Sequence, residues 1–352
     1  MDRQNIKSLD HDALVHALAE WGEPKFRVKQ IEQWLWHHGA SDFEDMTNLS
    51  KRLREALAER YFIPTSRITA RQVSEDGTRK YLMSFEDGTS VETVGIPSAD
   101  ETRLTVCFST QAGCAMGCVF CATGHAGFAR NLQSYEMFDQ VKLVGDDFGK
   151  RVSNVVAMGQ GEPFANYDEL IAALHLMNDE KFLNIGARHI TVSTCGILQG
   201  IEQFALEPEQ FTLAISLHSA IQETRDLLMP GIRSHTLAEL NETLKRYAER
   251  TGRRPTLEYA PIDGVNDDDT HLDALIAFCR GMLCHVNLIP LNPITSESDP
   301  YCMHPSPRIG QFERSLNAHG IETTIRSSRG ADIDGACGQL KQRHKRMKQP
   351  GK

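Results

Sequence analysis

Three cysteines in one short segment constrain this chain more than any other feature of its sequence. Cys114, Cys118 and Cys121 lie in the stretch Gly-Cys-Ala-Met-Gly-Cys-Val-Phe-Cys, and this C-x3-C-x2-C spacing places three thiolates on one loop. A tetrahedral zinc site or a fully protein-ligated iron–sulfur cluster usually has four protein ligands. Three thiolates on a cubane of four irons leave one iron open to an outside ligand. The alternatives are a zinc loop that a distant residue completes, and three unrelated thiols.

The composition is that of an ordinary globular chain from a reducing compartment. Its 352 residues suit one large α/β domain, or a core domain with a small appendage, and it has 40% hydrophobic and 24% charged residues. We find neither a run near the roughly 18 apolar residues of a membrane span nor the apolar stretch of a secretion signal. Nine cysteines without regular spacing favour the reducing cytosol over a disulfide scaffold. We therefore expect a cytoplasmic protein without membrane contact.

The charge balance limits the partners that the chain can recognise. A net charge of −9 argues against a generally basic nucleic-acid binder but does not exclude one, because phosphate contacts need only a local basic patch. Two segments could form such a patch, namely Lys51-Arg52-Leu53-Arg54 and the tail from Lys341 to Lys348. The alternatives for them are a solvated helix face and a frayed chain end.

The first part of the chain has the pattern of a small helical module. Asp10 can cap a first helix, a second follows Pro24 and stops at Gly39, and a third contains Leu53 and Leu57 at helical spacing. Two alternating segments then predict a β-hairpin around the turn Glu86-Asp87-Gly88. We divide the chain into a helical accessory domain (1–65), a β-hairpin extension (66–100), a core with a carboxy-terminal loop (101–344) and a basic tail (345–352).

The core has the alternation of short β-rich runs and amphipathic helices that is typical of parallel α/β folds. Six runs are too few for an eightfold barrel, so we expect an open, partial (β/α)6 barrel, with a last run following at 323–327. Ligands of such folds bind at the carboxyl ends of the strands. The unusual polar residues cluster at these ends: the cysteine loop, residues 159–163, Ser193, Ser216, His218 and Asn292. The predicted strands are 104–109, 153–158, 189–193, 212–217, 257–262 and 286–290, and the predicted helices include 168–177, 237–249, 271–282 and 309–319.

The chain resembles the RlmN/Cfr family of radical S-adenosylmethionine (SAM) methyltransferases, which methylate a ring carbon of adenine in RNA. The resemblance spans nearly the whole length. It implies a radical SAM barrel with a [4Fe–4S] cluster on Cys114, Cys118 and Cys121, and SAM on the open iron. Its implied SAM contacts are Gly161, Glu162, Ser193, Ser216, Leu217, His218 and Asn292. The motifs that carry it are Val-Glu92-Thr-Val-Gly-Ile-Pro, Cys107-Phe-Ser-Thr-Gln-Ala-Gly-Cys114, Met-Gly-Gln-Gly161-Glu162-Pro, Ser216-Leu217-His218, Val-Asn-Leu-Ile-Pro-Leu-Asn292-Pro and Asp332-Ile-Asp334-Gly-Ala-Cys337-Gly-Gln-Leu.

The resemblance also implies roles for three further residues. Polar methyl transfer needs a nucleophile, and an adenine ring carbon has no lone pair to offer. In the family's route, Cys337 takes a methyl group from one SAM, because a thiolate is a good nucleophile. A deoxyadenosyl radical from a second SAM then removes hydrogen from this S-methyl group, and the methylene radical adds to the ring. Glu92 accepts the ring proton, and Cys107 attacks Cys337 to form a disulfide and release the RNA.

Each of these residues also has a structural alternative. Cys107 ends a buried strand and could be a small core residue. Glu92 in an edge hairpin would by default be a solvated carboxylate, and a lone His218 is more often structural. Cys195, Cys279, Cys284 and Cys302 match no functional position of the family.

The family divides into two activities, and the sequence favours one of them. C2 methylation modifies 23S ribosomal RNA at the peptidyl-transferase centre and often a transfer RNA adenine beside the anticodon, whereas C8 methylation confers antibiotic resistance. The Glu92 motif and Arg326-Ser-Ser-Arg329-Gly look more like the C2 branch. Gln160 replaces a common methionine and Cys195 a common serine, which leaves the chemical residues intact. The implied partners are RNA and an electron donor such as flavodoxin or ferredoxin; a non-catalytic zinc or iron–sulfur RNA-binding protein is the alternative.

Overall fold

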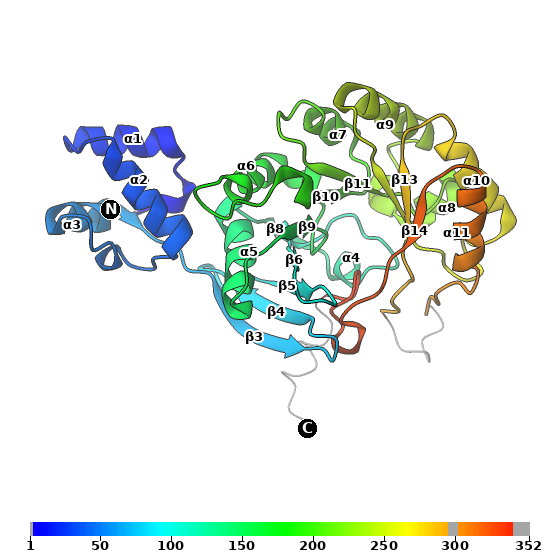
Figure 1. Ribbon diagram of the computed structural model, residues 1–352, viewed down its shortest axis with the longest axis horizontal. Helices are drawn as coiled ribbons and strands as arrows, with labels where there is room; N and C mark the ends of the chain where they lie inside the picture. Colours follow the sequence, from blue (N-terminus) through cyan, green and yellow to red (C-terminus); the bar gives the residue numbers. More distant parts are fainter. Residues whose placement is uncertain (1–2, 295–301, 341–352) are drawn as a thin grey trace.

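A ten-stranded sheet organises the protein, in the order β14-β13-β12-β11-β10-β9-β6-β5-β4-β3. The computed structural model describes residues 3–294 and 302–340. Seven neighbouring strands run parallel and curve around the centre of the molecule (Figure 1). The predicted partial α/β barrel is thereby confirmed, with the last run as a seventh parallel strand. These strands are β6 (Leu104–Cys107), β9 (Asn154–Ala157), β10 (Ile190–Thr194), β11 (Thr212–Ser216), β12 (Thr256–Tyr259), β13 (His285–Leu288) and β14 (Thr323–Ile325).

Crossover helices cover the outer face of this sheet, as the predicted βα alternation requires. The four predicted helices are present, with ends that differ by a few residues, and α5, α7 and α8 add to them. The aliphatic side chains of strands and helices share one hydrophobic core. The helices are α5 (Ser134–Phe148), α6 (Tyr167–Asn178), α7 (Leu198–Phe204), α8 (Gln222–Leu228), α9 (Leu237–Thr251), α10 (Asp269–Cys279) and α11 (Ile309–Ala318).

The first crossover carries the cysteine loop and has extra elements that the sequence pattern did not predict. A small antiparallel pair, β7 (Gln111–Gly113) and β8 (Phe128–Asn131), flanks the loop, and the short helix α4 (Ala122–Ala126) follows the third cysteine. The two strands bring the ends of the loop together. The loop thus leaves the carboxyl end of β6, and its two ends are joined by the β7–β8 pair.

Three antiparallel strands extend the sheet beyond β6. The predicted hairpin is confirmed as β4 (Arg79–Ser84) and β5 (Ser90–Pro97), and β3 (Arg67–Val73) forms an outer strand that was not predicted. β5 also pairs with β6, so it lies inside the sheet and not at an edge. The described part of the segment after β14 passes beside β4, where Asp334 accepts a hydrogen bond from Lys80, and brings residues 337–340 to the open centre of the barrel (Figure 1).

The amino-terminal helices form a module at one side of the barrel, as predicted (Figure 1). Asp10 caps the first helix and Gly39, in a left-handed conformation, ends the second helical segment. The module docks on α5 through a buried ion pair between Lys7 and Asp139 at 2.9 Å and an edge-to-face contact between Trp36 and Phe138. Its elements are β1 (Gln4–Asn5), α1 (His11–Glu20), α2 (Phe26–Glu32) with a π-helical continuation (Gln33–His38), α3 (Lys51–Arg60) and β2 (Tyr61–Phe62).

Among the described residues, no helix is both long and apolar enough to cross a membrane.

Candidate active site

A cavity of about 150 Å³ opens at the carboxyl ends of the parallel strands. The structure brings most of the expected cofactor-binding residues to its wall. Leu217 is the exception, because its side chain is buried in the hydrophobic core and only its main chain lies near the strand end. The expected residues that line the cavity are Cys114, Cys118, Cys121, Gly161, Glu162, Ser193, Ser216, His218, Asn292 and Cys337.

Main-chain hydrogen bonds hold the cysteine loop against two other segments. Val119 N donates to Leu228 O at the end of α8 (3.0 Å), and Ala122 N donates to Gly338 O (2.7 Å), next to Cys337. Gly124 lets α4 pass close to the loop, since a Cβ atom there would lie 2.8 Å from Cys118 N. The loop is therefore fixed to the barrel on one side and to the carboxy-terminal loop on the other.

The three thiols of the cysteine loop share one wall of this cavity. Cys114, Cys118 and Cys121 all line it, and Cys114 and Cys121 act electrostatically on Cys118. Three thiolates beside an open cavity suit a cluster that keeps one site for an outside ligand, whereas a structural zinc site has four protein ligands. Burial raises the pKa of the Cys114 thiol to about 11, so metal binding would have to displace its proton.

Glu162 fixes the turn after β9 from inside the protein. Its carboxylate accepts hydrogen bonds from Thr194 Oγ1 (2.6 Å), Cys195 N (2.7 Å) and Phe164 N (3.0 Å). Burial raises its pKa, and these hydrogen bonds oppose the shift. Glu162 still lines the cavity, so its carboxylate stands beside the space that a cationic ligand group would enter. The adjacent Gly161 has φ +107°, and a Cβ there would meet Gln111 at 2.6 Å.

A second buried carboxylate in this wall was not anticipated from the sequence. Glu258 on β12 is 4% exposed, accepts a hydrogen bond from Ser193 Oγ (3.3 Å), and lies 4.0 Å from Arg326 Nη1. Burial raises its pKa, and Arg326 opposes this. The position of Glu258 in the sequence could have pointed to it, because a glutamate inside a strand that is expected to be buried needs a polar neighbour.

His218 combines a structural and a cavity-lining position. Its Nδ1 accepts a hydrogen bond from Ala260 N (3.1 Å), which places the remaining proton of the neutral ring on Nε2. Its φ of 53° is stabilised by Asn266 Nδ2, which donates to His218 O (2.6 Å). Burial and the charge of Arg225 lower the pKa of His218 to about 3. The ring is therefore neutral at physiological pH, and it lines the cavity together with Phe120, with which it makes an edge-to-face contact.

A second cavity, of about 210 Å³, is lined by the two cysteines to which the family resemblance gives a role outside the cluster. Cys107, at the end of β6, and Cys337, in the carboxy-terminal loop, line it together although 230 positions separate them in the sequence. Cys337 also lines the first cavity and thus stands between the two. The other residues shared by both walls are Met158, Ile289, Asn292 and Leu340.

Arg326 provides the positive charge beside these two thiols. It lines the second cavity, and its Nη1 lies 3.6 Å from Met158 Sδ. Burial and the neighbouring Cys337 raise the pKa of Cys107 to about 12, and Arg326 opposes the rise. The Cys337 side chain is accessible from the cavities, but the surrounding protein raises its pKa to about 11, again against the effect of Arg326. The guanidinium therefore favours the thiolate at both sulfurs.

Glu92 is buried rather than solvated, so the alternative drawn from an edge hairpin is wrong. It is 1% exposed, and Lys80 Nζ lies 3.7 Å from its Oε1. The reason is that β5 pairs with strands on both sides. Glu92 and Val94 are two residues apart on β5 and point to the same face, and Val94 lines the second cavity. Glu92 itself does not line either cavity.

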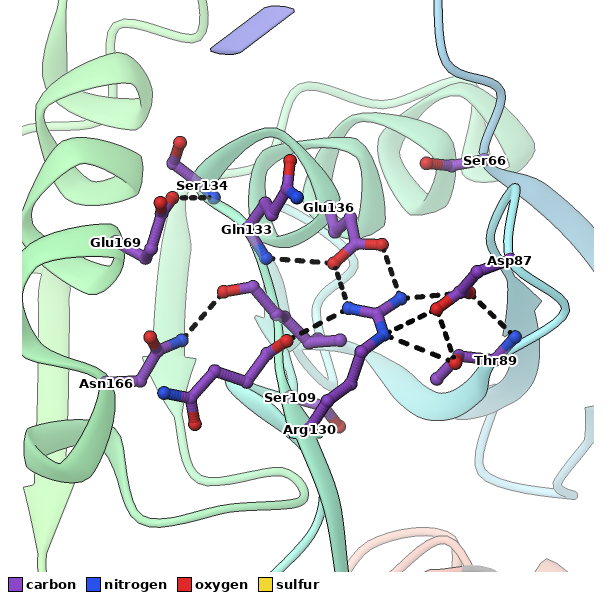
Figure 2. A network of polar contacts seen from close by, with 12 residues as sticks. Ser66, Asp87, Thr89, Ser109, Arg130, Gln133, Ser134, Glu136, Asn166 and Glu169 are labelled. Atoms are coloured by element: carbon purple, nitrogen blue, oxygen red, sulfur yellow. Dashed lines mark hydrogen bonds and ion pairs between the residues drawn. The ribbon is translucent and has the colours of Figure 1, made fainter. Parts of the chain in front are cut away.

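A charged network anchors the strand that follows the cysteine loop (Figure 2). The Arg130 guanidinium on β8 contacts Glu136 at the start of α5 through two hydrogen bonds (2.7 and 2.8 Å). On its other side it contacts Asp87, in the β4–β5 turn, at 2.7 and 3.0 Å. One side chain thus joins the cysteine-loop hairpin, a core helix and the antiparallel extension.

The structure treats the two basic segments differently. Lys51 and Arg54 lie on α3 and pair with Glu55 (3.7 Å) and Glu44 (2.9 Å), so this segment is partly neutralised. The segment from Lys341 to Lys348 lies outside the described residues. A basic RNA-binding patch stays a prediction.

Comparison with known proteins assigns the chain to a family. Residues 4–63 match the model of the ribosomal RNA large subunit methyltransferase N-terminal domain, and residues 108–275 match the radical SAM superfamily. A Geobacillus kaustophilus protein, named "Probable dual-specificity RNA methyltransferase RlmN", is 46% identical over 345 residues, which cover 97% of this chain and 93% of that protein. The chain belongs to the RlmN family of radical SAM methyltransferases.

Further RlmN relatives and a solved structure agree with this assignment. The Bacillus subtilis protein of the same name is 45% identical, with 97% of this chain and 93% of that protein covered. The crystal structure of a radical SAM methyltransferase from Sphaerobacter thermophilus has a TM-score of 0.88 at 42% identity, covering 96% of this chain and 99% of that one. The superfamily implies SAM and a [4Fe–4S] cluster as cofactors.

Proposed function

We propose that the protein methylates C2 of an adenine in 23S ribosomal RNA, at the peptidyl-transferase centre, and in transfer RNA next to the anticodon. The observation that carries this proposal is the position of Cys337, which lines both a cavity with the cluster cysteines and a cavity with Cys107. A methyl carrier must reach a methyl donor on one side and an RNA base on the other. The names of the RlmN relatives, which describe dual-specificity RNA methyltransferases, support the choice of RNA.

In this proposal Cys114, Cys118 and Cys121 would hold the cluster. A [4Fe–4S] centre with SAM on its open iron supplies a deoxyadenosyl radical that can remove hydrogen from an unactivated methyl group. Glu162 and Ser193 line the wall where the amino and carboxylate groups of SAM would lie. Ser216, His218 and Asn292 complete that wall, and Gly161 allows the backbone to approach closely.

The remaining steps belong to side chains around the second cavity. The Cys337 thiolate attacks the methyl carbon of a first SAM, S-adenosylhomocysteine leaves, and Cys337 carries the S-methyl group. After the carrier carbon has bonded to the base, Glu92 accepts the ring proton, and the unpaired electron that radical addition leaves on the ring passes to an acceptor, for which the oxidised cluster would serve. The Cys107 thiolate then attacks Cys337 Sγ: an S–S bond forms, the C–S bond breaks, and its electron pair goes to the methylene carbon, which takes up a proton. A thiol reductant must reopen the disulfide before the next cycle.

The choice of C2 over C8 rests on sequence motifs around Glu92 and Arg326. Mass spectrometry of ribosomal RNA from cells with and without this protein tests it directly. Loss of 2-methyladenosine in cells without the protein supports the proposal. Loss of 8-methyladenosine would assign the protein to the resistance branch, and unchanged RNA would leave the non-catalytic alternative.

The requirement for reduced thiols and a reduced cluster also suggests where the protein works. We infer a cytosolic enzyme that receives electrons from a small donor such as flavodoxin or ferredoxin. Reconstitution with each purified donor in place of a chemical reductant would identify the partner as the donor that supports turnover. If neither donor supports turnover, both are excluded.

A further inference from the structure

A buried lysine stands beside the proposed base. Lys80 on β4 is 3% exposed, Glu92 on β5 is 1% exposed, and Lys80 Nζ lies 3.7 Å from Glu92 Oε1. Lysine and glutamate are almost never fully buried unless they are paired. A buried carboxylate without a nearby cation takes up a proton rather than remain charged. The nearby Lys80 Nζ therefore favours the charged form of the Glu92 carboxylate.

The strand register places this pair in line with the cysteines. Lys80 is opposite Val94, and Val94 is opposite Cys107, on the neighbouring strands β4, β5 and β6. Residues that are opposite each other in a sheet point to the same face. Glu92, two positions from Val94, shares this face. Lys80 and Glu92 thus lie on the side of the sheet that carries the second cavity.

The ammonium group has a second contact, with the carboxy-terminal loop. Lys80 Nζ donates a hydrogen bond to Asp334 O at 3.2 Å, three residues before Cys337. The turn that precedes β4 is fastened to the same loop, because Ser74 Oγ donates to Asp332 Oδ1 (2.6 Å). One cation therefore touches both the proposed base and the loop of the proposed methyl carrier.

We propose that Lys80 is a positioning residue that keeps the Glu92 carboxylate ionised and in register with the Cys337 loop. Proton removal from the RNA–Cys337 adduct then depends on it. In that step the ring C–H bond breaks, an O–H bond forms on Glu92, and the C–H electron pair stays in the ring, while the unpaired electron left by radical addition passes to an acceptor such as the oxidised cluster. This inference rests on the proposed function, because it needs the adduct to form.

The test separates the half-reactions of the cluster-loaded protein, supplied with SAM, a chemical reductant and an RNA transcript. Peptide mass spectrometry measures S-methylation of Cys337, which does not require Glu92. Denaturing electrophoresis measures the protein–RNA adduct, and nucleoside analysis measures released methylated RNA. Lys80→Met keeps the apolar stem and removes the charge, whereas Lys80→Arg keeps the charge.

We expect Lys80→Met to retain Cys337 S-methylation within about twofold and to accumulate the adduct, as we also expect of Glu92→Gln. Released product should fall at least about tenfold, because a general base contributes roughly 10²–10⁴-fold. Lys80→Arg should recover most of the release. The matched control is Lys7→Met, which breaks the buried Lys7–Asp139 pair outside the site and should leave the ratio of adduct to released RNA unchanged.

Three outcomes would overturn the inference. The first is wild-type release from Lys80→Met, and the second is loss of Cys337 S-methylation in that variant at normal iron content. The third concerns the double variant Lys80→Met/Glu92→Gln, which removes both charges of the buried pair. This variant keeps the test valid if Lys80→Met misfolds. It should match Glu92→Gln alone, since coupled residues are non-additive, and a further loss of release contradicts the inference. Absence of product and adduct from the wild type would instead refute the proposed function.

Discussion

Replacing Arg130 with methionine should destabilise the hairpin that presents the cysteine loop. Arg130 makes paired hydrogen bonds to Glu136 and Asp87, and β8, which carries it, follows the loop directly (Figure 2). The side chain of Glu136 is only 2% exposed, whereas that of Asp87 is 49% exposed. The two contacts should therefore contribute very different amounts to stability.

The buried contact determines the magnitude. Removal of one partner of a buried ion pair leaves an uncompensated charge and costs about 3–5 kcal/mol. The exposed contact adds at most about 1 kcal/mol, since solvent screens it, although Arg130 holds the pKa of Asp87 down to about 2. Gln133 N still donates to Glu136, which favours the lower end of this range. At about 2 °C per kcal/mol for a chain of this size, Tm should fall by roughly 6–10 °C.

Thermal denaturation of three variants, followed by circular dichroism, measures this effect. Arg130→Met should show the full decrease, and Arg130→Met/Glu136→Gln should recover much of it, because the double variant removes the stranded charge. The control is Arg246→Met, which breaks a pair with Glu202 whose side chains are both more than half exposed. Iron content after reconstitution should fall in Arg130→Met. A Tm within about 1 °C of wild type, on the scale of the exposed control, would refute the reasoning.

Three further predictions concern the cysteines. Replacement of Cys114, Cys118 and Cys121 by alanine should abolish the brown colour and the bound iron of anaerobically reconstituted protein; stoichiometric zinc without sulfide in the wild type would contradict the cluster. Cys107→Ala should trap the covalent RNA adduct on denaturing gels, whereas Cys337→Ala should give neither adduct nor methylated adenine; free product at wild-type yield from Cys107→Ala would exclude its assigned role. Since the pKa of Cys107 is about 12, its thiolate fraction grows about tenfold per pH unit from pH 7 to 9. The rate at which the isolated wild-type adduct breaks down, measured in samples quenched at successive times, should rise with pH accordingly. A breakdown rate that does not change with pH would argue against attack by a thiolate.

The parts of the site that lie at strand ends could be predicted from the sequence. Parallel strands bring their carboxyl ends to one edge, so residues after different strands, such as Glu162, Ser193 and His218, had to meet. The three cluster cysteines are close together in the sequence, so a single loop is enough to bring their side chains to one place. Burial of Cys107 also followed from its position at the end of an apolar run.

Long-range contacts depend on information that the sequence pattern lacks. β3 has no fully buried residue and contains only three apolar side chains, Ile68, Ala70 and Val73, so its pattern did not predict a strand. The Lys80–Glu92 pair depends on the register of β4 with β5. The approach of Cys337 to Cys107 depends on the path of a loop after the last strand, and only the family resemblance predicted it.

The fate of the methyl hydrogens tests the central claim most directly. Turnover with SAM that carries a fully deuterated methyl group separates a carrier on Cys337 from direct transfer. The account predicts that the RNA methyl group retains two of the three deuterium atoms and that one appears in deoxyadenosine, because the S-methyl group of Cys337 loses one hydrogen before it bonds to the base. RNA that contains the intact trideuterated methyl group would contradict the account.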